Sequence, residues 1–378
     1  MRQTHGATLA VAILLGCSGI AAARVARAQS PNESPAPAAA VPAGSNLLNP
    51  NVSVIGWFQA EGGDESDEVG TQSFALKEAE LGFQANVDPY SRADFFISVN
   101  PEEGIDLEEG YLSLLTLPAG LTAKLGKFRS NFGKFNRTHP PETPFADRPL
   151  AAERFLGEEG LSAVGLSVSW LVPMPVYLNL DAEVTTTPDR ADVPAFEALR
   201  GQDLMYLSRL STFFDLGEAT NFTLGASVAN GANGFAGPDT TLPGPGADAL
   251  RATMVGADIT FRWKNPRRAI YRSLVAQAEW MQRRGERFQA SDEEGSGGFA
   301  YADYQFARRW HVGARYDWAE TLQGGSADTG ALGFLTFTPS EFSLVSAQVR
   351  HRDIGDDSEM TYFLKTTFNI GPHGQHPF

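Results

Sequence analysis

Strand-length segments in which apolar and polar residues alternate recur along the chain, and they constrain its fold more than any other feature. In the clearest segment, residues 255–264, one face holds Val255, Ala257, Ile259, Phe261 and Trp263, and the other holds Gly256, Asp258, Thr260, Arg262 and Lys264. Successive side chains of a strand point to opposite faces, so the pattern predicts a strand of about ten residues with one apolar and one polar face. Similar segments cover residues 79–87, 93–99, 176–184 and 311–318. The chain is therefore predicted to be all-β.

The connections between these segments mostly alternate in length. Seven short turns are predicted near residues 87–92, 117–121, 171–176, 214–221, 264–269, 306–311 and 338–342. Eight polar and generally longer connections are predicted near residues 61–73, 100–106, 129–160, 185–203, 230–250, 284–298, 320–330 and 351–359. Together they join about sixteen strands, and both ends of the chain then lie on the side of the short turns. A soluble β-sandwich has no reason to separate the two kinds of connection, so the pattern favours a transmembrane antiparallel β-barrel of the outer-membrane type.

Residues 1–28 are predicted to be a cleaved signal peptide that directs the chain to the bacterial outer membrane. Arg2 and His5 precede the apolar run 7–20, and Ala-Arg-Ala at 26–28 matches a small-x-small cleavage site. The apolar run is too short for a comfortable membrane helix, which needs about 20 residues.

Two further segments complete the predicted organisation. Cys17, the only cysteine, follows Leu-Leu-Gly and resembles the cleavage site of a bacterial lipoprotein, so acylation of Cys17 stays open as an alternative. Residues 29–50 are rich in Pro and Ala and are expected to form a flexible leader. Residues 51–378 are expected to form the barrel.

Charge and composition exclude several functions. The chain has 45 Asp and Glu against 30 Lys and Arg, a formal charge of −15, which argues against a nucleic-acid partner because phosphate binding needs a basic face. A single cysteine excludes a disulfide scaffold and a cysteine-rich metal site. His373 and His376 lack a third ligand, so no metal site is predicted, and no cofactor.

No catalytic residues are predicted, because the sequence contains no nucleophile elbow, zinc-protease motif or P-loop. Ser130, His139 and Asp147 could serve a hydrolase, but a set like this arises by chance in a polar loop of this length.

The third long connection, residues 129–160, is unusually apolar for a surface loop, with Phe132, Phe135, Phe145, Leu150, Phe155 and Leu156. An exposed loop would leave these apolar side chains in water, whereas a loop folded into the lumen would pack them against the inner wall of the barrel. A sixteen-stranded barrel is wide enough for an aqueous channel unless something narrows it. The loop is therefore predicted to form a constriction.

Charged residues of two groups are candidates for setting ion preference, since rings of charged side chains govern the selectivity of pores. The candidate constriction residues are Lys124, Lys127, Arg129, Lys134, Arg137, Glu142, Asp147, Arg148 and Arg154, interleaved with Glu153, Glu158 and Glu159. The candidate wall residues are Glu78, Glu80, Asp181, Glu183, Asp258, Arg262, Arg315 and Asp317, with Arg209 and Glu279. The alternative for each is a solvated wall residue or a structural ion pair.

One stretch of the chain resembles a known family. Lys124–Arg129 followed by Asn131-Phe132-Gly133, after Glu108-Glu109-Gly110-Tyr111, is similar to the corresponding part of the phosphate-selective porins. The resemblance implies a sixteen-strand channel that assembles as a homotrimer. Members that select phosphate carry lines of Arg and Lys in the lumen. Cleavage after Ala28 leaves 27 Lys and Arg against 45 Asp and Glu here, a formal charge of −18, so phosphate selectivity is not expected.

The sequence thus predicts a porin for passive diffusion of ions and small hydrophilic solutes, in contact with outer-membrane lipid and lipopolysaccharide. A receptor-type transporter needs about 22 strands, which this chain is too short to supply. The remaining alternative is a barrel with a filled lumen that acts as an enzyme or as a structural or adhesive protein.

Overall fold

The computed structural model describes residues 50–64, 74–101, 104–198, 201–234, 250–268, 271–286, 292–322 and 325–371. The chain divides into residues 1–42 and 43–378, and the second unit contains the fold described below. The predicted signal peptide, nearly all of the leader, Cys17, His373 and His376 lie outside the described residues. No helix of the described part is long and apolar enough to cross a membrane.

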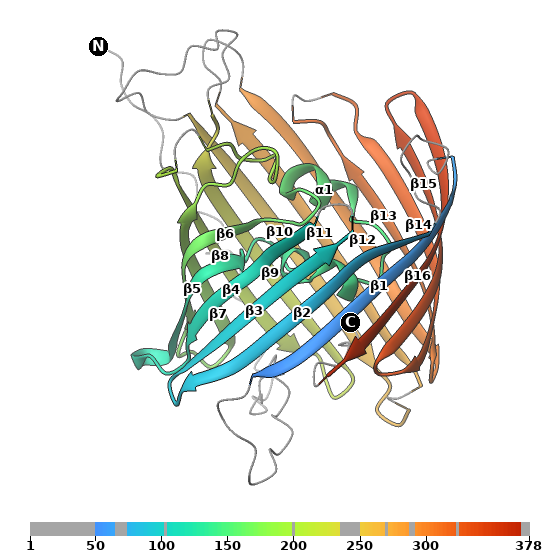
Figure 1. Ribbon diagram of the computed structural model, residues 1–378, viewed down its shortest axis with the longest axis horizontal. Helices are drawn as coiled ribbons and strands as arrows, with labels where there is room; N and C mark the ends of the chain where they lie inside the picture. Colours follow the sequence, from blue (N-terminus) through green and yellow to red (C-terminus); the bar gives the residue numbers. More distant parts are fainter. Residues whose placement is uncertain are drawn as a thin grey trace, which may run out of the picture. The chain divides into compact units, whose positions relative to one another are not determined.

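Sixteen antiparallel strands form a closed barrel in which each strand pairs with its neighbours in sequence and β1 pairs with β16 (Figure 1). The strands are β1 (Asn51–Gly63), β2 (Phe74–Asp88), β3 (Ser91–Asn100), β4 (Gly104–Leu114), β5 (Leu121–Arg129), β6 (Ser162–Leu171), β7 (Tyr177–Thr186), β8 (Leu204–Asp215), β9 (Thr220–Ala232), β10 (Arg251–Lys264), β11 (Ser273–Gly285), β12 (Glu293–Ala307), β13 (Trp310–Ala319), β14 (Asp328–Ser340), β15 (Ser343–Ile354) and β16 (Asp357–Ile370). The predicted barrel of about sixteen strands is confirmed.

The connections follow the predicted order, with one clear difference in length. A short turn joins each predicted pair of strands, from β2–β3 to β14–β15. The eighth long connection was predicted over residues 351–359, but Ile354 and Asp357 pair across a two-residue turn. Gly355 adopts φ +61° there, and because glycine tolerates a positive φ, the polar residues on either side continue the ladder.

The barrel reverses the usual distribution of polarity in a soluble protein. In β10, Asp258 is 5% exposed and faces the interior, whereas its neighbour Ile259 is 40% exposed and faces outward. Large exposed apolar residues occur around the wall, among them Leu125, Leu166, Tyr206, Leu224, Val255, Trp280, Tyr316, Val349 and Leu364. Closure pairs the strand edges, which lipid requires of any spanning structure. The predicted alternation therefore corresponds to an apolar outer face and a polar inner face.

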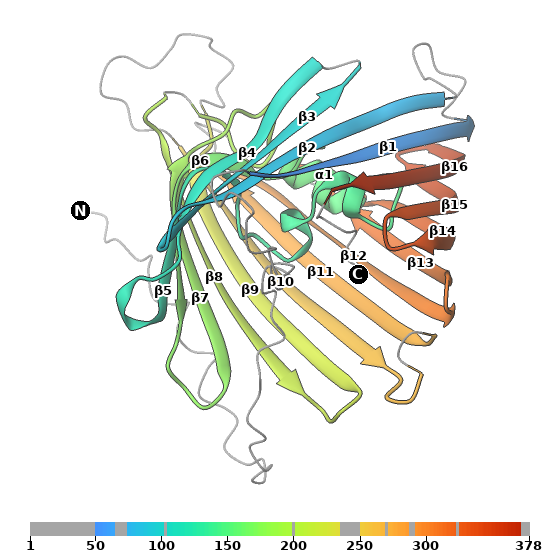
Figure 2. The same cartoon turned by 60° about the horizontal axis from the view of Figure 1, so that its bottom comes forward.

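The third long connection folds into the barrel, as predicted (Figure 2). It contains the 3-10 helices η3 (Phe135–Arg137) and η4 (Pro140–Glu142) and the helix α1 (Leu150–Leu156), while η2 (Pro118–Gly120) lies in the turn before β5. The Phe145 ring packs edge-on against Tyr301 and Phe334, with centroids 5.1 and 6.0 Å away. Phe155 and Leu156 join a second buried cluster. The apolar content of the loop thus fixes it to the inner wall.

Candidate functional site

Residues 130–161, called the lumen loop below, are held by polar side chains from strands all around the barrel. These contacts come from Glu183 of β7, Ser227 of β9, Glu279 of β11, Asp317 of β13, Gln348 of β15 and Lys365 of β16. They are mostly hydrogen bonds to backbone groups of the loop, which a non-repetitive segment must satisfy when it is buried. The loop therefore crosses the lumen and is attached on several sides.

The start of the loop is held by Glu279. The backbone amides of Lys134 and Phe135 both donate to Glu279 Oε1, at 2.9 and 2.6 Å. Gly133 adopts φ +64°, and a Cβ atom there would lie 2.5 Å from Glu279 Oε2. Glycine at 133 thus permits both the left-handed turn and the close approach of the carboxylate.

Asp147, in the middle of the loop, accepts hydrogen bonds from three arginines of the wall. Arg315 Nη2 lies 3.0 Å from Asp147 Oδ1, and Arg350 Nη1 and Arg352 Nη2 lie 3.1 and 2.9 Å from Oδ2. The side chain of Lys365 donates to three carbonyl groups of the same loop, those of Pro140, Thr143 and Phe145. These four basic residues belong to β13, β15 and β16 and form a basic arc of the wall.

An acidic arc lies on the other side of β1, on β2 and β4. Glu78, Glu80, Glu108 and Glu109 are all buried there, and His139 of the lumen loop is inserted among them. His139 Nδ1 lies 3.0 Å from Glu80 Oε2 and 2.8 Å from Glu108 Oε2, and Nε2 lies 2.8 Å from Glu109 Oε1. Burial alone lowers the pKa of an imidazolium, but these carboxylates outweigh burial and raise the pKa of His139 well above its usual value.

The structure separates the predicted constriction residues by their exposure. Arg137 is exposed, and Lys124, Lys134 and Glu142 are half-buried. The ammonium group of Lys124 lies 4.3 Å from the centroid of the Tyr111 ring, and Lys134 Nζ donates to Thr260. These residues carry part of the charge that remains accessible on and beside the loop.

Other predicted constriction residues are held in buried contacts. Arg129 pairs with Glu108 at 2.6 Å, and Arg154 pairs with Asp328 at 2.6 Å. Arg148 is buried without a hydrogen-bond partner for its guanidinium, and burial together with Arg129 lowers the pKa of Arg148 to about 10. Three acidic neighbours remain partly accessible: Glu153 is half-buried, and Glu158 and Glu159 are exposed.

Lys127 is the predicted constriction residue that the structure places away from the loop. It pairs with Asp106 at 3.3 Å, and the Asp106 side chain is 70% exposed. Lys127 lies two residues from Leu125, which is 60% exposed, and pairs with Val164 of β6, which is 54% exposed, so Lys127 belongs to the outer face of β5. Arg129 turns inward where the strand ends.

Most of the predicted wall residues are buried and face the interior. Arg209 binds Asp258 through two hydrogen bonds of 2.6 and 2.9 Å, and Arg315 Nε donates to Asp317 at 2.5 Å. Asp181 accepts a hydrogen bond from the side chain of Asn179, and Glu183 accepts hydrogen bonds from the Asn131 backbone amide and the Ser167 hydroxyl. Arg262 is half-buried. The alternative of structural ion pairs therefore describes Asp258, Arg315 and Asp317.

Sequence reasoning missed Arg350, Arg352, Lys365, Glu108 and Glu109 as charged residues of the lumen. Glu108 and Glu109 are adjacent, and both are buried because a β-bulge shifts the register opposite Phe96 and Ile97. A strict period of two assigns only one of them to the inner face. In residues 348–352, by contrast, the polar residues Gln348, Arg350 and Arg352 fall on every second position, so alternation alone could have assigned them to the inner face.

The residues considered for a hydrolase are not assembled into a catalytic set. His139 contacts three glutamates and Asp147 contacts three arginines. In the described part of the chain, no hydrogen bond or ion pair joins any two of Ser130, His139 and Asp147.

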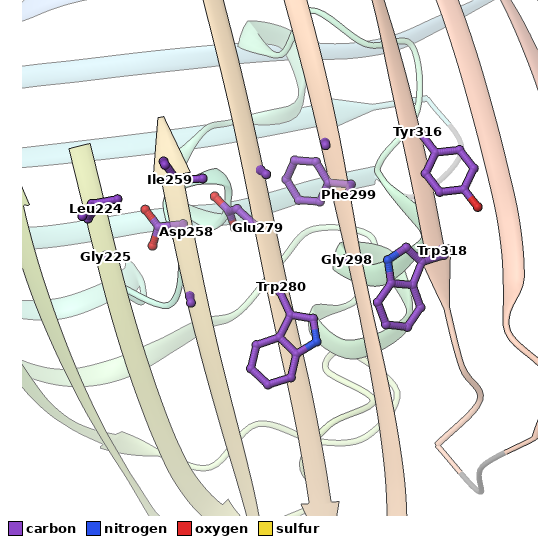
Figure 3. A pocket seen from close by; sticks show the side chains of 13 residues that line it. Leu224, Gly225, Asp258, Ile259, Glu279, Trp280, Gly298, Phe299, Tyr316 and Trp318 are labelled. Carbon is purple, nitrogen blue, oxygen red and sulfur yellow. The ribbon is translucent and has the colours of Figure 1, made fainter. Parts of the chain in front are cut away.

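A hollow of about 650 Å³ lies at the wall over β9–β13 (Figure 3). Gly298 pairs with Trp280 on one side and Trp318 on the other, so a residue without a side chain lies between two indoles. Asp258, Glu279 and Phe299 of the inner face also line it. The hollow is mainly apolar and carries no set of converging polar groups.

Comparison with known proteins supports the fold. No family model matches the sequence. An uncharacterized protein of Aquifex aeolicus (strain VF5) is 32% identical over 355 residues, covering 85% of this chain and 74% of that protein. Similar solved structures include a loop-deletion mutant of OmpT, an outer membrane protein of Vibrio cholerae, with 11% identity, TM-score 0.55 and coverage of 85% of this chain and 99% of that one.

Two further structures are similar. An anion-selective porin from Comamonas acidovorans has 11% identity and a TM-score of 0.55, and the match covers 85% of this chain and 100% of that one. The outer membrane channel DcaP of Acinetobacter baumannii has 14% identity and a TM-score of 0.54, and the match covers 85% of this chain and 96% of that one. At these identities the likeness establishes the porin fold alone. It does not single out the phosphate-selective porins that the segment near Lys124–Arg129 resembles.

Proposed function

The chain belongs to the same family as the Aquifex aeolicus protein and has the fold of outer-membrane porins, and on this basis we propose that it is a channel for passive diffusion of ions and small hydrophilic solutes. Its place would be the bacterial outer membrane, reached through a cleaved signal peptide. A homotrimer is proposed with it, since one similar structure is described as a trimer form of OmpT. Neither catalysis nor a substrate for chemical conversion forms part of the proposal.

The observation that carries the proposal is that charged side chains remain accessible on and beside the lumen loop. Lys124, Lys134 and Arg137 are half-buried or exposed, whereas Glu80, Glu108 and Glu109 are buried against His139 and Arg129. Pore selectivity depends on the charged side chains that line the path of a passing ion. Acidic groups are accessible there too, since Glu142 and Glu153 are half-buried and Glu158 and Glu159 are exposed, so Lys124, Lys134 and Arg137 are proposed to favour anions only locally, on and beside the loop.

A second candidate function rests on how densely the loop is packed. Phe132, Phe135, Phe145, Phe155 and Leu156 are almost fully buried between the loop and the wall. A barrel filled in this way could serve a structural or adhesive role and would pass no ions. Electrical measurements separate the two candidates directly.

Reversal potentials in a salt gradient test the proposed selectivity. We expect Arg137→Glu and Lys124→Glu to shift the reversal potential toward cation preference, because each replaces an accessible positive charge beside the loop. Lys127→Glu is the matched control, since Lys127 lies in an exposed ion pair with Asp106 on the outer face. An unchanged potential in both lumen variants, or an equal shift in Lys127→Glu, would contradict the assignment of these residues to the permeation path.

A further inference from the structure

The acidic arc contains a cluster of ligand-type atoms from three separate parts of the fold. Glu80 of β2, Glu108 of β4 and His139 of the lumen loop each offer one atom, and the three atoms lie within 4.8 Å of one another. The three residues are separated in sequence but converge where the loop meets the wall. All three are buried.

Buried polar atoms without a hydrogen-bond partner gather at this place. Glu78 Oε1 and Glu108 Oε1 have no hydrogen-bond partner, and Glu80 Oε2 and Glu108 Oε2 both lie within 3.0 Å of a single nitrogen, His139 Nδ1. A buried polar atom that lacks a hydrogen bond costs about 1–3 kcal/mol, so two such atoms beside two carboxylate oxygens that share one nitrogen require an explanation. A bound cation would contact such atoms directly.

The hydrogen bonds that orient His139 resemble those that orient metal-binding histidines in other proteins. His139 Nε2 donates to Glu109 Oε1 at 2.8 Å, which leaves Nδ1 directed at Glu80 and Glu108. Glu109 is itself oriented, because its Oε2 accepts the backbone amide of Arg129 at 2.9 Å. Histidines that bind metals usually donate their second ring nitrogen to a carboxylate in this way.

The balance of charge also favours a cation. Four carboxylates (Glu78, Glu80, Glu108 and Glu109) are buried in the arc, and Arg129 pairs with one of them at 2.6 Å. Buried carboxylates are strongly destabilised unless a positive charge compensates them. A divalent ion bound by neutral His139 supplies more compensation than a proton on the ring does.

We propose that Glu80, Glu108 and His139 bind one divalent transition-metal ion, which fastens the lumen loop to β2 and β4. One imidazole with two carboxylates suits Zn²⁺, Mn²⁺ or Fe²⁺ better than Mg²⁺ or Ca²⁺, which prefer oxygen ligands alone. Three protein ligands leave a position for water or a passing anion. The site depends on the position of the loop and not on whether the barrel conducts ions.

Zn²⁺ binding to the purified full-length protein in detergent tests the proposal. The reference protein carries H373Q and H376Q, so that two histidines outside the proposed site are removed as ligands. We expect it to bind one Zn²⁺ per barrel by calorimetry, and Glu80→Gln and His139→Gln to bind at least about tenfold more weakly. His311→Gln is the matched control, because His311 faces the single carboxylate of Asp303 at 3.2 Å and should leave binding unchanged.

Two results would overturn the site. One is that the reference protein binds no Zn²⁺ at micromolar concentration, and the other is that folded His139→Gln binds Zn²⁺ as tightly as the reference. If His139→Gln fails to fold, a second measurement, which needs no substitution in the proposed site, still tests the proposal. Co²⁺ added to the reference protein should give the absorption bands of nitrogen and oxygen ligation, displaced by Zn²⁺, and a spectrum identical to aqueous Co²⁺ counts against the proposal.

Discussion

Single charged residues around the lumen loop differ in whether their charge is compensated. Arg315 contacts both Asp147 and Asp317, whereas the guanidinium of Arg148 is buried without a hydrogen-bond partner. Removing one partner of a buried ion pair leaves an uncompensated charge, while removing a charge that has no partner relieves a desolvation cost. Substitutions to methionine at the two positions should therefore act in opposite directions.

Arg315→Met is expected to lower the free energy of unfolding of the barrel by about 3–5 kcal/mol, because buried Asp317 loses its arginine, while Asp147 loses one of its three. Arg148→Met is expected to leave this free energy unchanged or to raise it, because the buried guanidinium has no hydrogen-bond partner and methionine can still pack on the Phe135 ring. Urea unfolding in detergent micelles, followed by tryptophan fluorescence, measures both. A loss in Arg148→Met as large as that in Arg315→Met would show that Arg148 has a compensating contact.

Alternation in the sequence indicates which face a residue takes where the strands are regular. Glu78, Glu80, Asp258 and Asp317 were assigned to the inner wall by alternation and are buried there. Glu109 was missed because the bulge opposite Phe96 interrupts the period of two. Which charges pair with one another depends on where each residue of the lumen loop meets the wall, and neither periodicity nor composition specifies those positions.

Among the elements, the lumen loop depends most on its aromatic anchors. Phe145 is fully buried and packs edge-on against two rings of the wall. Phe145→Ala is expected to lower the free energy of unfolding by about 3–5 kcal/mol through the lost contacts and the cavity. Calorimetric or urea unfolding tests this, with Phe342→Ala as control, because Phe342 is exposed in the β14–β15 turn. Equal losses in the two variants would contradict anchoring by Phe145.

The number and order of the strands could be predicted because turns and alternation are local signals. The inward path of the loop could be predicted as well, since its phenylalanines and leucines have no other apolar surface to cover. The length of the last connection could not, because Gly355 allows a turn of two residues within a polar stretch. Polar residues at the end of a hairpin are compatible with either a loop or a longer ladder.

At the scale of the whole molecule, a barrel with an apolar outer face and a charged interior makes an acidic chain of modest hydropathy compatible with the proposed place in a membrane. The acidity lies partly in buried pairs, and accessible groups of both signs border the lumen loop. The central claim is that water and ions pass beside this loop.

Single-channel recording in planar lipid bilayers tests that claim most directly. The purified, correctly folded protein is expected to produce discrete conductance steps, with larger steps in Phe145→Ala, where the loop is less firmly held. Folding is checked by the resistance of the unheated barrel to unfolding in SDS. Folded protein that inserts into the bilayer and produces no steps would contradict the channel and favour the filled barrel.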